Sequence, residues 1–352
     1  MIISRTPYRI SFFGGGTDYP GWYLKNGGQV LSTTIDKYLY ISCRYLPPFF
    51  EHRLRLVYSR IEECQHSSAL DHPSAKEVLK FLGIENGLEI HYDGDLPGRS
   101  GLGSSSSFTV GLLNALYAYL DQTVSNHRLS TESIHIEQDL INETVGSQDQ
   151  VNAAYGGLNR IRFKQSGEII VDPITLPKER LEALDQNLML LYTGIIRTAE
   201  KVAKSYVTDI GAKGKQLDRM HAMVDQAMDL MRNGDLDDFG RLLNDAWQKK
   251  RSLSKLVSNP QVDEIYASAI DAGALGGKLS GAGGGGFLLL YVPVEKHTDV
   301  RRKLSHLLHV PFSFESKGSQ VIFHDSHKEY KEEEKKRFES SIQDFIELKD
   351  LD

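Results

Sequence analysis

The segment from Asp95 to Leu120 constrains the fold of this chain most strongly, because a glycine- and serine-rich stretch runs without a break into an apolar one. The stretch begins with Pro97, Gly98, Gly101, Leu102 and Gly103, followed by Ser104, Ser105, Ser106 and Ser107. Glycine permits positive φ and serine hydroxyls cap helix N-termini, so we expect a loop, serine N-caps and an amphipathic helix that continues to Leu120. Residues 88–93 alternate like a strand, which makes the unit strand, glycine loop and helix.

The junction between this loop and its helix is suited to binding an anion. At a helix N-terminus, backbone N–H groups without intrahelical partners and the positive end of the helix dipole point to the same place. The serine hydroxyls can add hydrogen bonds, and one of them can serve as a magnesium ligand. We therefore expect a polyphosphate here. A flexible Gly/Ser linker is the alternative, but a linker has no reason to run directly into an apolar helix.

The segment matches neither of two common phosphate-binding motifs. A Walker P-loop ends in Lys and Ser/Thr, whereas the nearest approach in the chain, residues 273–279, is one residue short and ends in Leu279. A dinucleotide fingerprint needs a third glycine where Ser106 stands. It also needs an acidic residue at the end of a second strand, and Asp121 instead ends the same helix.

An N-terminal glycine triplet is the second feature that indicates a binding site. The strand-like run 2–13, which we expect Pro7 to interrupt, leads into Gly14-Gly15-Gly16. The tight turn that follows places Asp18 so that its carboxylate projects towards whatever the turn faces. Local capping of the backbone is the alternative role for a single Asp in a turn.

A third glycine cluster, residues 276–286, feeds the apolar residues 287–292, for which we expect a buried strand. A helical pattern at 263–272 precedes the cluster. An ordinary turn from helix to strand needs only one or two glycines. This density of glycine therefore indicates close approach of the backbone to a ligand or to another loop.

Acidic residues in the segment 131–150 form a further candidate constellation. A helical pattern covers residues 131–143, and we expect this helix, which carries Glu137, to end near Val145. A short polar turn then presents Asp149. Two carboxylates so placed can serve as metal ligand and proton acceptor, whereas a solvated helix face and a helix cap are the alternative roles.

Composition limits the classes of protein to which the chain can belong. With 352 residues we expect two domains, and the net charge of −6 argues against nucleic acid as a partner. Cys43 and Cys64 form no metal-binding pattern and favour a reducing compartment, so we expect a cytoplasmic protein. No apolar run reaches the ~18 residues that span a membrane, and the N-terminus does not resemble a signal peptide, so we expect no membrane partner.

Taken together, the glycine clusters resemble the motifs of the GHMP kinase superfamily, which includes galactokinase, homoserine kinase, mevalonate kinase and phosphomevalonate kinase. The similar stretches occur in the family's order at 7–19, 97–106 and 278–286. Within the superfamily the chain is most similar to bacterial D-glycero-D-manno-heptose 7-phosphate kinases. That similarity lies in residues 12–20, 32–38 and 145–150.

The resemblance implies an α+β, two-domain GHMP kinase fold. Residues 1–180 would form an N-terminal, ATP-binding domain like domain 2 of ribosomal protein S5. Residues 181–352 would form a ferredoxin-like C-terminal domain with a charged helical tail from about 326. ATP and the sugar would meet between the two domains.

The resemblance also implies roles for individual residues. Asp149 matches the family's catalytic Asp, and Arg9 matches the Arg beside it. The glycine loop and its four serines would hold the ATP phosphates. One of Ser104–Ser107, of which we name Ser105, would complete the coordination of Mg²⁺ together with Glu137. The residues expected on the substrate side are Gly15, Gly16, Thr17, Asp18, Lys37, Arg197, Gly281 and Gly283.

The reaction that the resemblance implies is ATP-dependent phosphorylation of the anomeric (C1) hydroxyl of D-glycero-D-manno-heptose 7-phosphate. It would give heptose 1,7-bisphosphate and ADP, on the way to nucleotide-activated heptose for surface polysaccharide. The alternatives are another sugar-1-kinase, fucokinase-like or mannose-type, a non-catalytic sensor of sugar and ATP, and a decarboxylase of the mevalonate branch. Tyr8 stands where galactokinase-like motifs have Gly, and residues 13–16 replace their Ile-Gly-Glu-His, which argues against galactose.

A substrate that already carries a phosphate needs a cationic pocket away from ATP. Lys37 and Arg44 follow the first glycine cluster, and Arg197 lies where a strand is expected to turn into the helix 199–206. We prefer Arg197, because a guanidinium at such a turn can hold phosphate bidentately. Decoration of the helix start is its alternative role. The expected partners are thus ATP and a sugar phosphate. The sequence does not determine the oligomeric state, and it is compatible with a homodimer.

Overall fold

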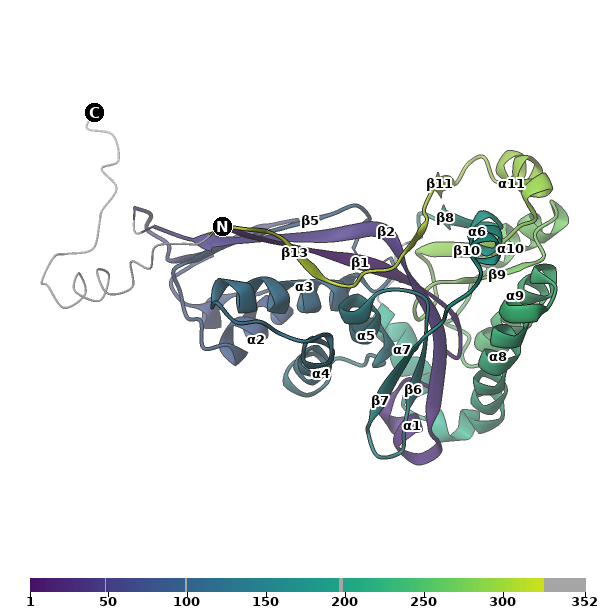
Figure 1. Ribbon diagram of the computed structural model, residues 1–352, viewed down its shortest axis with the longest axis horizontal. Helices are drawn as coiled ribbons and strands as arrows, with labels where there is room; N and C mark the ends of the chain where they lie inside the picture. Colours follow the sequence, from purple (N-terminus) through teal and green to yellow (C-terminus); the bar gives the residue numbers. More distant parts are fainter. Residues whose placement is uncertain (48, 99, 196–198, 326–352) are drawn as a thin grey trace, which may run out of the picture.

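The computed structural model describes residues 1–47, 49–98, 100–195 and 199–325. These residues form two β-sheets with helices packed on them, so the protein is α+β, as expected (Figure 1). Two predictions fall outside the described residues, namely the charged helical tail from about 326 and the phosphate anchor Arg197.

The first sheet is built on one long antiparallel pair of strands. β1 (Ile2–Phe13) pairs with β2 (Gly28–Tyr45), and the short helix α1 (Pro20–Asn26) lies in their connection. Pro7 does not interrupt β1, which corrects the expectation. It lies where the register with β2 shifts and beyond the part of β1 that pairs with the last strand, so its missing N–H breaks no ladder on that side.

Other strands extend the first sheet in the order β13-β1-β2-β5-β3-β4, where β3 is Leu54–Val57, β4 is Ile61–Cys64 and β5 is Leu88–Gly94. The start of β2 also pairs with β6 (Asn159–Phe163), which pairs with β7 (Ile169–Pro173). β12 (Phe314–Glu315) and β13 (Gln320–His324) come from the other end of the chain and pair with β2 and β1. No local sequence pattern predicts this return to the first sheet.

Helices cover one face of the first sheet, among them α2 (Pro73–Phe81) and α3 (Ser104–Tyr119) (Figure 1). All residues of α3 from Ser106 to Tyr117 are buried, because the helix lies between the sheet and other helices. The helix is therefore buried on all sides, which corrects the expectation of an amphipathic helix. The N-cap is Gly103, with φ of 81°, and not a serine, so the four serines form the first turn of the helix.

The acidic segment also differs from its prediction. α4 (Asn126–His135) begins after Ser125, whose hydroxyl accepts a hydrogen bond from the Arg128 N–H, and it continues into a π-helical turn, Ile136–Leu140. The helix therefore ends about five residues before the expected Val145. Asp149 lies in the first turn of α5 (Gln148–Tyr155) and not in a polar turn. Glu137 belongs to the π-helical turn, a feature that recurs at functional sites.

The second sheet has four antiparallel strands in the order β11-β8-β10-β9. They are β8 (Leu188–Tyr192), β9 (Gly276–Leu279), β10 (Phe287–Tyr291) and β11 (Leu308–Val310). In chain order this is the 4-1-3-2 arrangement of a ferredoxin-like fold, as expected. Residues 276–279 are themselves a strand, so the third glycine cluster begins within the sheet and not in a loop.

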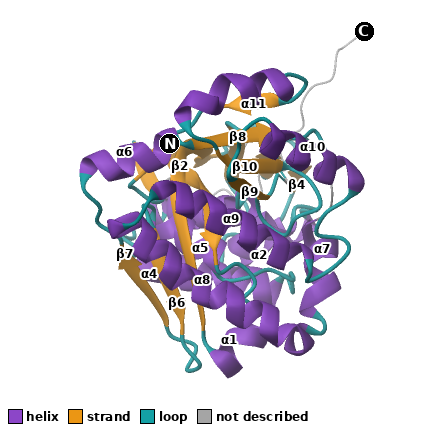
Figure 2. Cartoon of the chain, turned by 90° about the vertical axis from the view of Figure 1, so that its right-hand side faces the viewer, coloured by secondary structure: helices purple, strands orange, loops and turns teal. Residues whose placement is uncertain are grey.

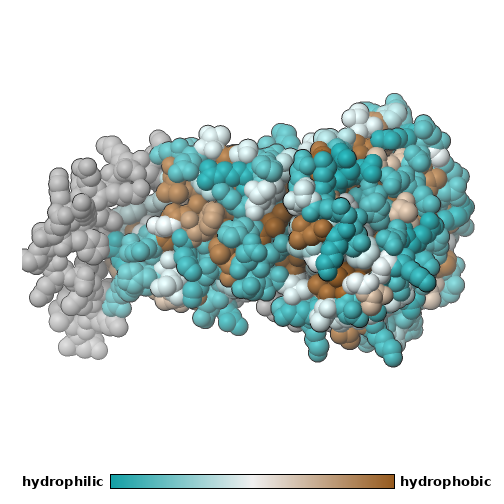
Figure 3. Space-filling view, turned by 90° about the horizontal axis from the view of Figure 1, so that it is seen from below, coloured by the Kyte–Doolittle hydropathy of each residue, from teal (hydrophilic) through white to brown (hydrophobic). Residues whose placement is uncertain are grey.

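The α-helices in the second half of the chain are α6 (Lys178–Gln186), α7 (Ala199–Val207), α8 (Gly214–Asn233), α9 (Leu236–Arg251), α10 (Pro260–Asp271) and α11 (His297–Lys303). These helices and the second sheet make up the second, C-terminal half of the molecule, and the elements before α6 make up most of the N-terminal half. Figure 2 shows the helices of the C-terminal half together. Figure 3 shows a face of the molecule that is mostly hydrophilic, with apolar side chains gathered towards its middle. Across the described ranges, no helix combines the length and apolarity that crossing a membrane requires.

The two halves share a hydrophobic core at their junction. Phe239 of α9 meets Phe12 and Phe13 of β1 edge to face, with ring centroids 5.5 and 5.1 Å apart. All three rings are fully buried, and such pairs contribute about 0.5–1.5 kcal/mol beyond their burial. The end of β1, which carries Arg9 and leads into the first glycine cluster, is thereby fixed against the second half.

Candidate active site

Arg9 and Asp149, expected to act together, form a bidentate ion pair. Arg9 Nε donates to Asp149 Oδ1 at 2.7 Å, and Nη2 donates to Oδ2 at 2.8 Å. The Arg9 side chain is 4% exposed and that of Asp149 is 17% exposed, so the carboxylate keeps one edge accessible while both oxygens are oriented. Bidentate guanidinium–carboxylate pairs fix geometry as well as charge.

The glycine loop lies directly against this pair. Arg9 Nη1 donates to the Gly101 carbonyl at 2.8 Å, and the Arg9 backbone N–H donates to the Leu102 carbonyl at 3.0 Å. Gly103 has positive φ, and a Cβ there would lie 3.2 Å from Arg9 Cγ and 3.6 Å from Asp149 Oδ2. The start of α3, with its unpaired backbone N–H groups, therefore faces the same place as the catalytic pair.

Asp18 is buried beside Asp149 and is not a solvent-exposed turn residue. Its Oδ1 accepts from the Gly16 N–H at 2.8 Å, and its Oδ2 accepts from Gln148 Nε2 at 2.9 Å. Gly146 leaves room for it, because a Cβ at Gly146 would lie 2.0 Å from Asp18 Oδ2. Burial raises the pKa of Asp18, and the negative charge of Asp149 raises it further.

Thr17 and Lys37, two predicted substrate residues, have other partners. The Thr17 hydroxyl is buried and donates to the carbonyls of Gly14 and Gln29, so its side chain stabilises the turn rather than facing a ligand. Lys37 Nζ pairs with the neighbouring Asp36 carboxylate at 3.0 Å. Gly15, in contrast, borders Gln148, with 3.8 Å between a Cβ at this position and Gln148 Nε2.

Glu137 is fully buried and meets Ser106, whereas the prediction named Ser105. Ser106 Oγ donates to Glu137 Oε2 at 2.8 Å, and Gln150 Nε2 donates to the same oxygen at 2.5 Å. Ser105, in contrast, is exposed. Burial, followed by the charge of Glu143, raises the pKa of Glu137 to about 7.

The Ser106–Glu137 pair fits a magnesium site. Glu137 Oε1 is buried and has no partner among the described residues, so one carboxylate oxygen is free to bind a cation. Mg²⁺ in phosphoryl-transfer enzymes commonly takes one or two protein oxygens, with phosphate oxygens and water completing its octahedron. Within the described residues no three His, Cys, Asp or Glu side chains group into a metal site, so the phosphates would have to supply ligands.

The third glycine cluster packs against the second through its backbone. A Cβ on Gly281, whose φ is +63°, would lie 2.7 Å from Gly101 Cα, and one on Gly286 would lie 2.3 Å from the Ser100 carbonyl oxygen. Gly283 similarly approaches the carbonyl of Val257. Of the two explanations offered by the sequence, approach to a ligand and approach to another loop, the second accounts for these glycines.

Sequence reasoning missed two buried lysines at this junction, Lys250 of α9 and Lys278 of β9, which are 6% and 5% exposed. Lys278 was part of a recognised motif but was given no role. Lys250 could have been found from periodicity. It follows Phe239, Leu243 and Trp247 on the buried stripe of α9, a position where an apolar residue is expected.

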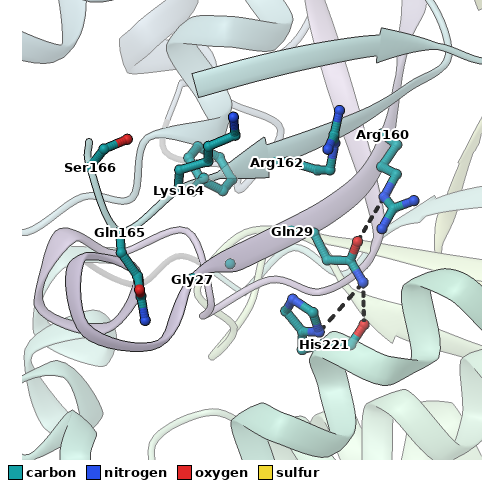
Figure 4. A pocket seen from close by; sticks show the side chains of 10 residues that line it. Gly27, Gln29, Arg160, Arg162, Lys164, Gln165, Ser166 and His221 are labelled. Atoms are coloured by element: carbon teal, nitrogen blue, oxygen red, sulfur yellow. Dashed lines mark hydrogen bonds between the residues drawn. The ribbon is translucent and has the colours of Figure 1, made fainter. Parts of the chain in front are cut away.

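A cavity of about 470 Å³ lies on the β2–β6 surface beside α8, and none of the predicted site residues lines it (Figure 4). Arg160, Arg162 and Lys164 line it, yet each has a carboxylate partner, at 3.0, 2.6 and 2.9 Å respectively. Gln29 and His221 line its inner side, where burial lowers the pKa of His221. The cavity therefore offers no surplus positive charge for a phosphate.

Two family models match the chain. The GHMP kinases N terminal domain matches residues 72–157, a range that contains the glycine loop, Glu137 and Asp149. The GHMP kinases C terminal domain matches residues 227–307, which contain both buried lysines and the third glycine cluster.

Similar proteins carry sugar-kinase names. A D-glycero-alpha-D-manno-heptose 7-phosphate kinase from Campylobacter jejuni subsp. jejuni serotype O:2 is 30% identical over 336 residues, covering 90% of this chain and 97% of that protein. A bifunctional fucokinase/GDP-fucose pyrophosphorylase from Arabidopsis thaliana is 27% identical over 85% of this chain, which spans 30% of that longer protein. The solved D-glycero-D-manno-heptose 1-phosphate kinase from Bacteroides thetaiotaomicron has a TM-score of 0.75 at 23% identity, covering 93% of this chain and all of that one, and supports the fold.

Proposed function

Because this chain belongs to the GHMP kinase family and is an ATP-dependent sugar kinase, we propose that its acceptor is the anomeric hydroxyl of D-glycero-D-manno-heptose 7-phosphate. The products are heptose 1,7-bisphosphate and ADP. The observation that carries this proposal is the bidentate Arg9–Asp149 pair against the glycine loop. A sensor that only binds ATP and sugar needs the loop but has no use for an oriented carboxylate beside it.

Asp149 positions the acceptor in this proposal. Its accessible edge accepts a hydrogen bond from the anomeric hydroxyl and turns the oxygen lone pair towards the γ-phosphorus. Proton removal can come late, since the transition state of phosphoryl transfer is loose. Arg9 fixes both oxygens of Asp149, and its positive charge stabilises the negative charge that develops on the transferred group.

The glycine loop and the first turn of α3 would hold the ATP phosphates. Gly103 is the N-cap of the helix, so the N–H groups of residues 104–106 lack intrahelical acceptors, whereas the Ser107 N–H already donates to the Gly103 carbonyl. The helix is sixteen residues long, so its dipole adds to the attraction for phosphate. The loop reaches the phosphates with its backbone because its glycines present no side chains there.

Ser106 and Glu137 are the residues that would hold Mg²⁺. The ion neutralises charge on the β- and γ-phosphates when bound. The structural contact of Ser106 with Glu137 favours this hydroxyl over that of Ser105. Loss of the Glu137 proton accompanies binding, because a carboxylate binds the cation only in its ionised form.

Asp18, with Gly15 and Gly16, would bind the sugar. The Asp18 carboxylate accepts from the Gly16 N–H and from Gln148 Nε2, and a carboxylate can accept about four hydrogen bonds, so it has capacity left for a sugar hydroxyl. The choice of heptose 7-phosphate over other sugars is supported by the relative from Campylobacter jejuni. The fucokinase relative supports another sugar-1-kinase as the second candidate.

The phosphate already present on the substrate needs its own cations. Arg197 is our proposed anchor, and Lys37, whose ammonium pairs with Asp36 in the structure, is the second candidate. Losing one charged hydrogen bond to phosphate should cost roughly 1.5–3 kcal/mol, or about ten- to a hundredfold in kcat/KM. The test compares heptose with heptose 7-phosphate in wild type and in Arg197→Ala. A preference for the phosphorylated sugar that survives in the variant would remove Arg197 from the site.

The reaction is tested by coupled detection of ADP release across heptose 7-phosphate, heptose, mannose, fucose, galactose and mevalonate. We expect the highest kcat/KM for heptose 7-phosphate. Faster turnover of fucose or mannose would replace the proposed acceptor by the second candidate. The absence of turnover with every acceptor, in a protein that binds ATP, would favour a sensor.

A further inference from the structure

Lys278 connects the second sheet to the end of β1. Its Nζ donates to the carbonyls of Ser11 at 2.8 Å and Phe12 at 3.0 Å, directly before the first glycine cluster. Ser11 is two residues beyond Arg9 along the same strand. The ammonium of Lys278 therefore lies beside the segment that carries the catalytic pair.

Lys250 connects α9 to the third glycine cluster. Its Nζ donates to the carbonyl of Leu279 at 3.0 Å and also to the carbonyl of Gly281. Gly281 packs on Gly101, whose carbonyl accepts the hydrogen bond from Arg9. Lys250 thus supports the loop that supports Arg9.

Neither ammonium has a carboxylate partner in the described part of the chain, although both are buried. Burying a charge without a counter-ion is costly, and the cost is avoidable here. A neutral amide side chain can also donate to two carbonyls, at a lower desolvation cost. Attachment of the loops alone therefore does not explain why both donors are charged.

The charges around the two lysines do not balance. The cations at this centre are Arg9, Lys250 and Lys278, and the carboxylates that face them are Asp18 and Asp149. The other titratable groups against these carboxylates are the phenols of Tyr19 and Tyr206, whose pKa values burial raises, so they stay neutral. When both lysines are protonated, the described residues thus leave a surplus of positive charge in a buried place.

We propose that Lys250 and Lys278 are positioning residues for phosphoryl transfer, and that their buried charge is matched only when an anionic phosphoryl group lies between the two halves of the site. This inference rests on the proposed function, since the group that completes the charge balance is the phosphate of the nucleotide or of the acceptor. The lysines act by holding the loops in place through hydrogen bonds and by the positive electrostatic potential that they create at the active centre.

Binding of an anion at this centre should be coupled to the protonation of the two lysines. Burial, with the charge of Arg9, lowers the pKa of Lys278 to about 7, while Asp18 opposes the shift. Burial, together with Lys278 and Arg9, also lowers the pKa of Lys250 well below its usual range. An arriving anion favours the charged form of both lysines, so binding should take up protons. Above neutral pH the free enzyme should therefore lose the charge that the reaction needs.

The first test is the pH dependence of kcat/KM with heptose 7-phosphate, or with the best acceptor found. The wild type should lose activity above about pH 7, approaching tenfold per pH unit, and kcat should fall only at higher pH because the bound anion raises the lysine pKa. Lys278→Arg keeps the charge without titrating in this range, so its fall in kcat/KM should lie at least about one pH unit higher. Superimposable profiles for the wild type and Lys278→Arg would overturn the proposal.

Lys278→Gln separates charge from hydrogen bonding. Glutamine keeps two N–H donors, so a purely structural lysine predicts activity within about threefold of the wild type. The proposal predicts a loss of at least about thirtyfold in kcat/KM at neutral pH, with kcat affected more than the KM for ATP. Lys249→Gln and Lys249→Arg are the matched controls, because Lys249 is the exposed neighbour on the same helix, and both should behave like the wild type.

The second test does not depend on the acceptor. Binding of a magnesium complex of a non-hydrolysable ATP analogue is measured by calorimetry near pH 8.5, in buffers of different ionisation enthalpy. At this pH Glu137, whose pKa is about 7, is already ionised and releases almost no proton when Mg²⁺ binds. The wild type should take up a fraction of a proton, and Lys278→Arg should take up clearly less. Zero uptake by the wild type would overturn the inference even if no variant folds. If no sugar is turned over but proton uptake is seen, the proposed function fails and the role of the lysines in anion binding stands.

Discussion

The two halves of the active centre handle charge in opposite ways. In the N-terminal half, charged groups meet their partners directly, as Arg9 meets Asp149 through two hydrogen bonds. In the C-terminal half, Lys250 and Lys278 donate to backbone carbonyls and, in the described residues, pair with no carboxylate. The first arrangement is complete before a substrate arrives, whereas the second is completed by an anion.

This difference assigns separate tasks to the two halves. The N-terminal half orients the acceptor and holds the nucleotide, for which a fixed geometry is needed. The C-terminal half supplies charge, which matters when the phosphoryl group is between the loops. The backbone contact of Gly101 with Gly281 joins the two tasks, because it places the loops of both halves against each other.

The largest effect is expected for Asp149→Asn. The substitution keeps the shape of the side chain but removes the charge that Arg9 orients and the acceptor hydroxyl needs. We expect kcat to fall by about 10²–10⁴, while the Kd for ATP changes little. Steady-state kinetics and a nucleotide titration measure the two quantities. The control is Asp139→Asn, an exposed acid in the preceding helical segment, which should retain wild-type turnover. If Asp149→Asn keeps turnover within about tenfold, Asp149 is not the acceptor-orienting group.

Gly103→Val tests whether the N-terminal half holds phosphate by its backbone. Gly103 has φ of +81°, and a side chain there would press on Arg9 and Asp149. We expect ATP affinity to fall at least about tenfold, or ~1.4 kcal/mol, with the fold retained in circular dichroism. The control Gly211→Val adds the same side chain where nothing lies within 4 Å, and it should bind ATP normally. Unchanged affinity in Gly103→Val would mean that the phosphates bind elsewhere.

Glu137→Gln tests the metal site through pH. Because burial raises the pKa of Glu137 to about 7, the wild type should need more Mg²⁺ as pH falls from about 8 to 6. The variant should need several-fold more Mg²⁺ and show no such pH dependence. The raised pKa of Glu137 should also make the stability of the fold depend on pH. The folded-state pKa exceeds the ordinary 4.5, so the stability that protonated Glu137 contributes is present below that value and is lost as pH rises through about 7. A Mg²⁺ requirement that is independent of pH in the wild type would exclude Glu137.

The C-terminal half should respond in the opposite direction when stability is measured. The pKa of Lys278 is about 7 in the folded protein and 10.5 in an ordinary lysine, so the unfolded chain binds more protons between these values. The contribution of Lys278 to stability therefore rises with pH across this window. Lys278→Met removes the buried charge, so we expect it to be as stable as or more stable than the wild type at neutral pH, and to be less active. Chemical denaturation at two pH values measures this. A strongly destabilised variant would indicate that the lysine is mainly a structural support.

Local features of the site could be predicted from the sequence. Features that depend on the direction in which a helical side chain points, or on pairing of strands far apart in the sequence, could not. The strand, glycine loop and helix around Gly103 follow from local composition, and the family resemblance brought Arg9 and Asp149 together across 140 residues. Ser106 rather than Ser105 meets Glu137 because the helix begins at Gly103, and this start fixes which serine turns inward.

The contribution of the C-terminal half was harder to predict. Strands β12 and β13 return to the first sheet through pairing that no local pattern reports. Lys250 was not recognised as a functional residue from the sequence, because a single lysine on an apolar helical stripe does not by itself indicate a site. Its position, three residues after Trp247 on the stripe that also carries Phe239 and Leu243, becomes informative only when the stripe is known to be buried.

The most direct test of the account is the identity of the bond that the enzyme makes. Phosphorus NMR of a reaction with ATP and D-glycero-D-manno-heptose 7-phosphate distinguishes a new anomeric phosphate by its coupling to the anomeric proton. We predict one such resonance beside the retained 7-phosphate for the wild type, and none on the same timescale for Asp149→Asn. A new phosphate without coupling to the anomeric proton, or equally fast phosphorylation of heptose that lacks the 7-phosphate, would contradict the account.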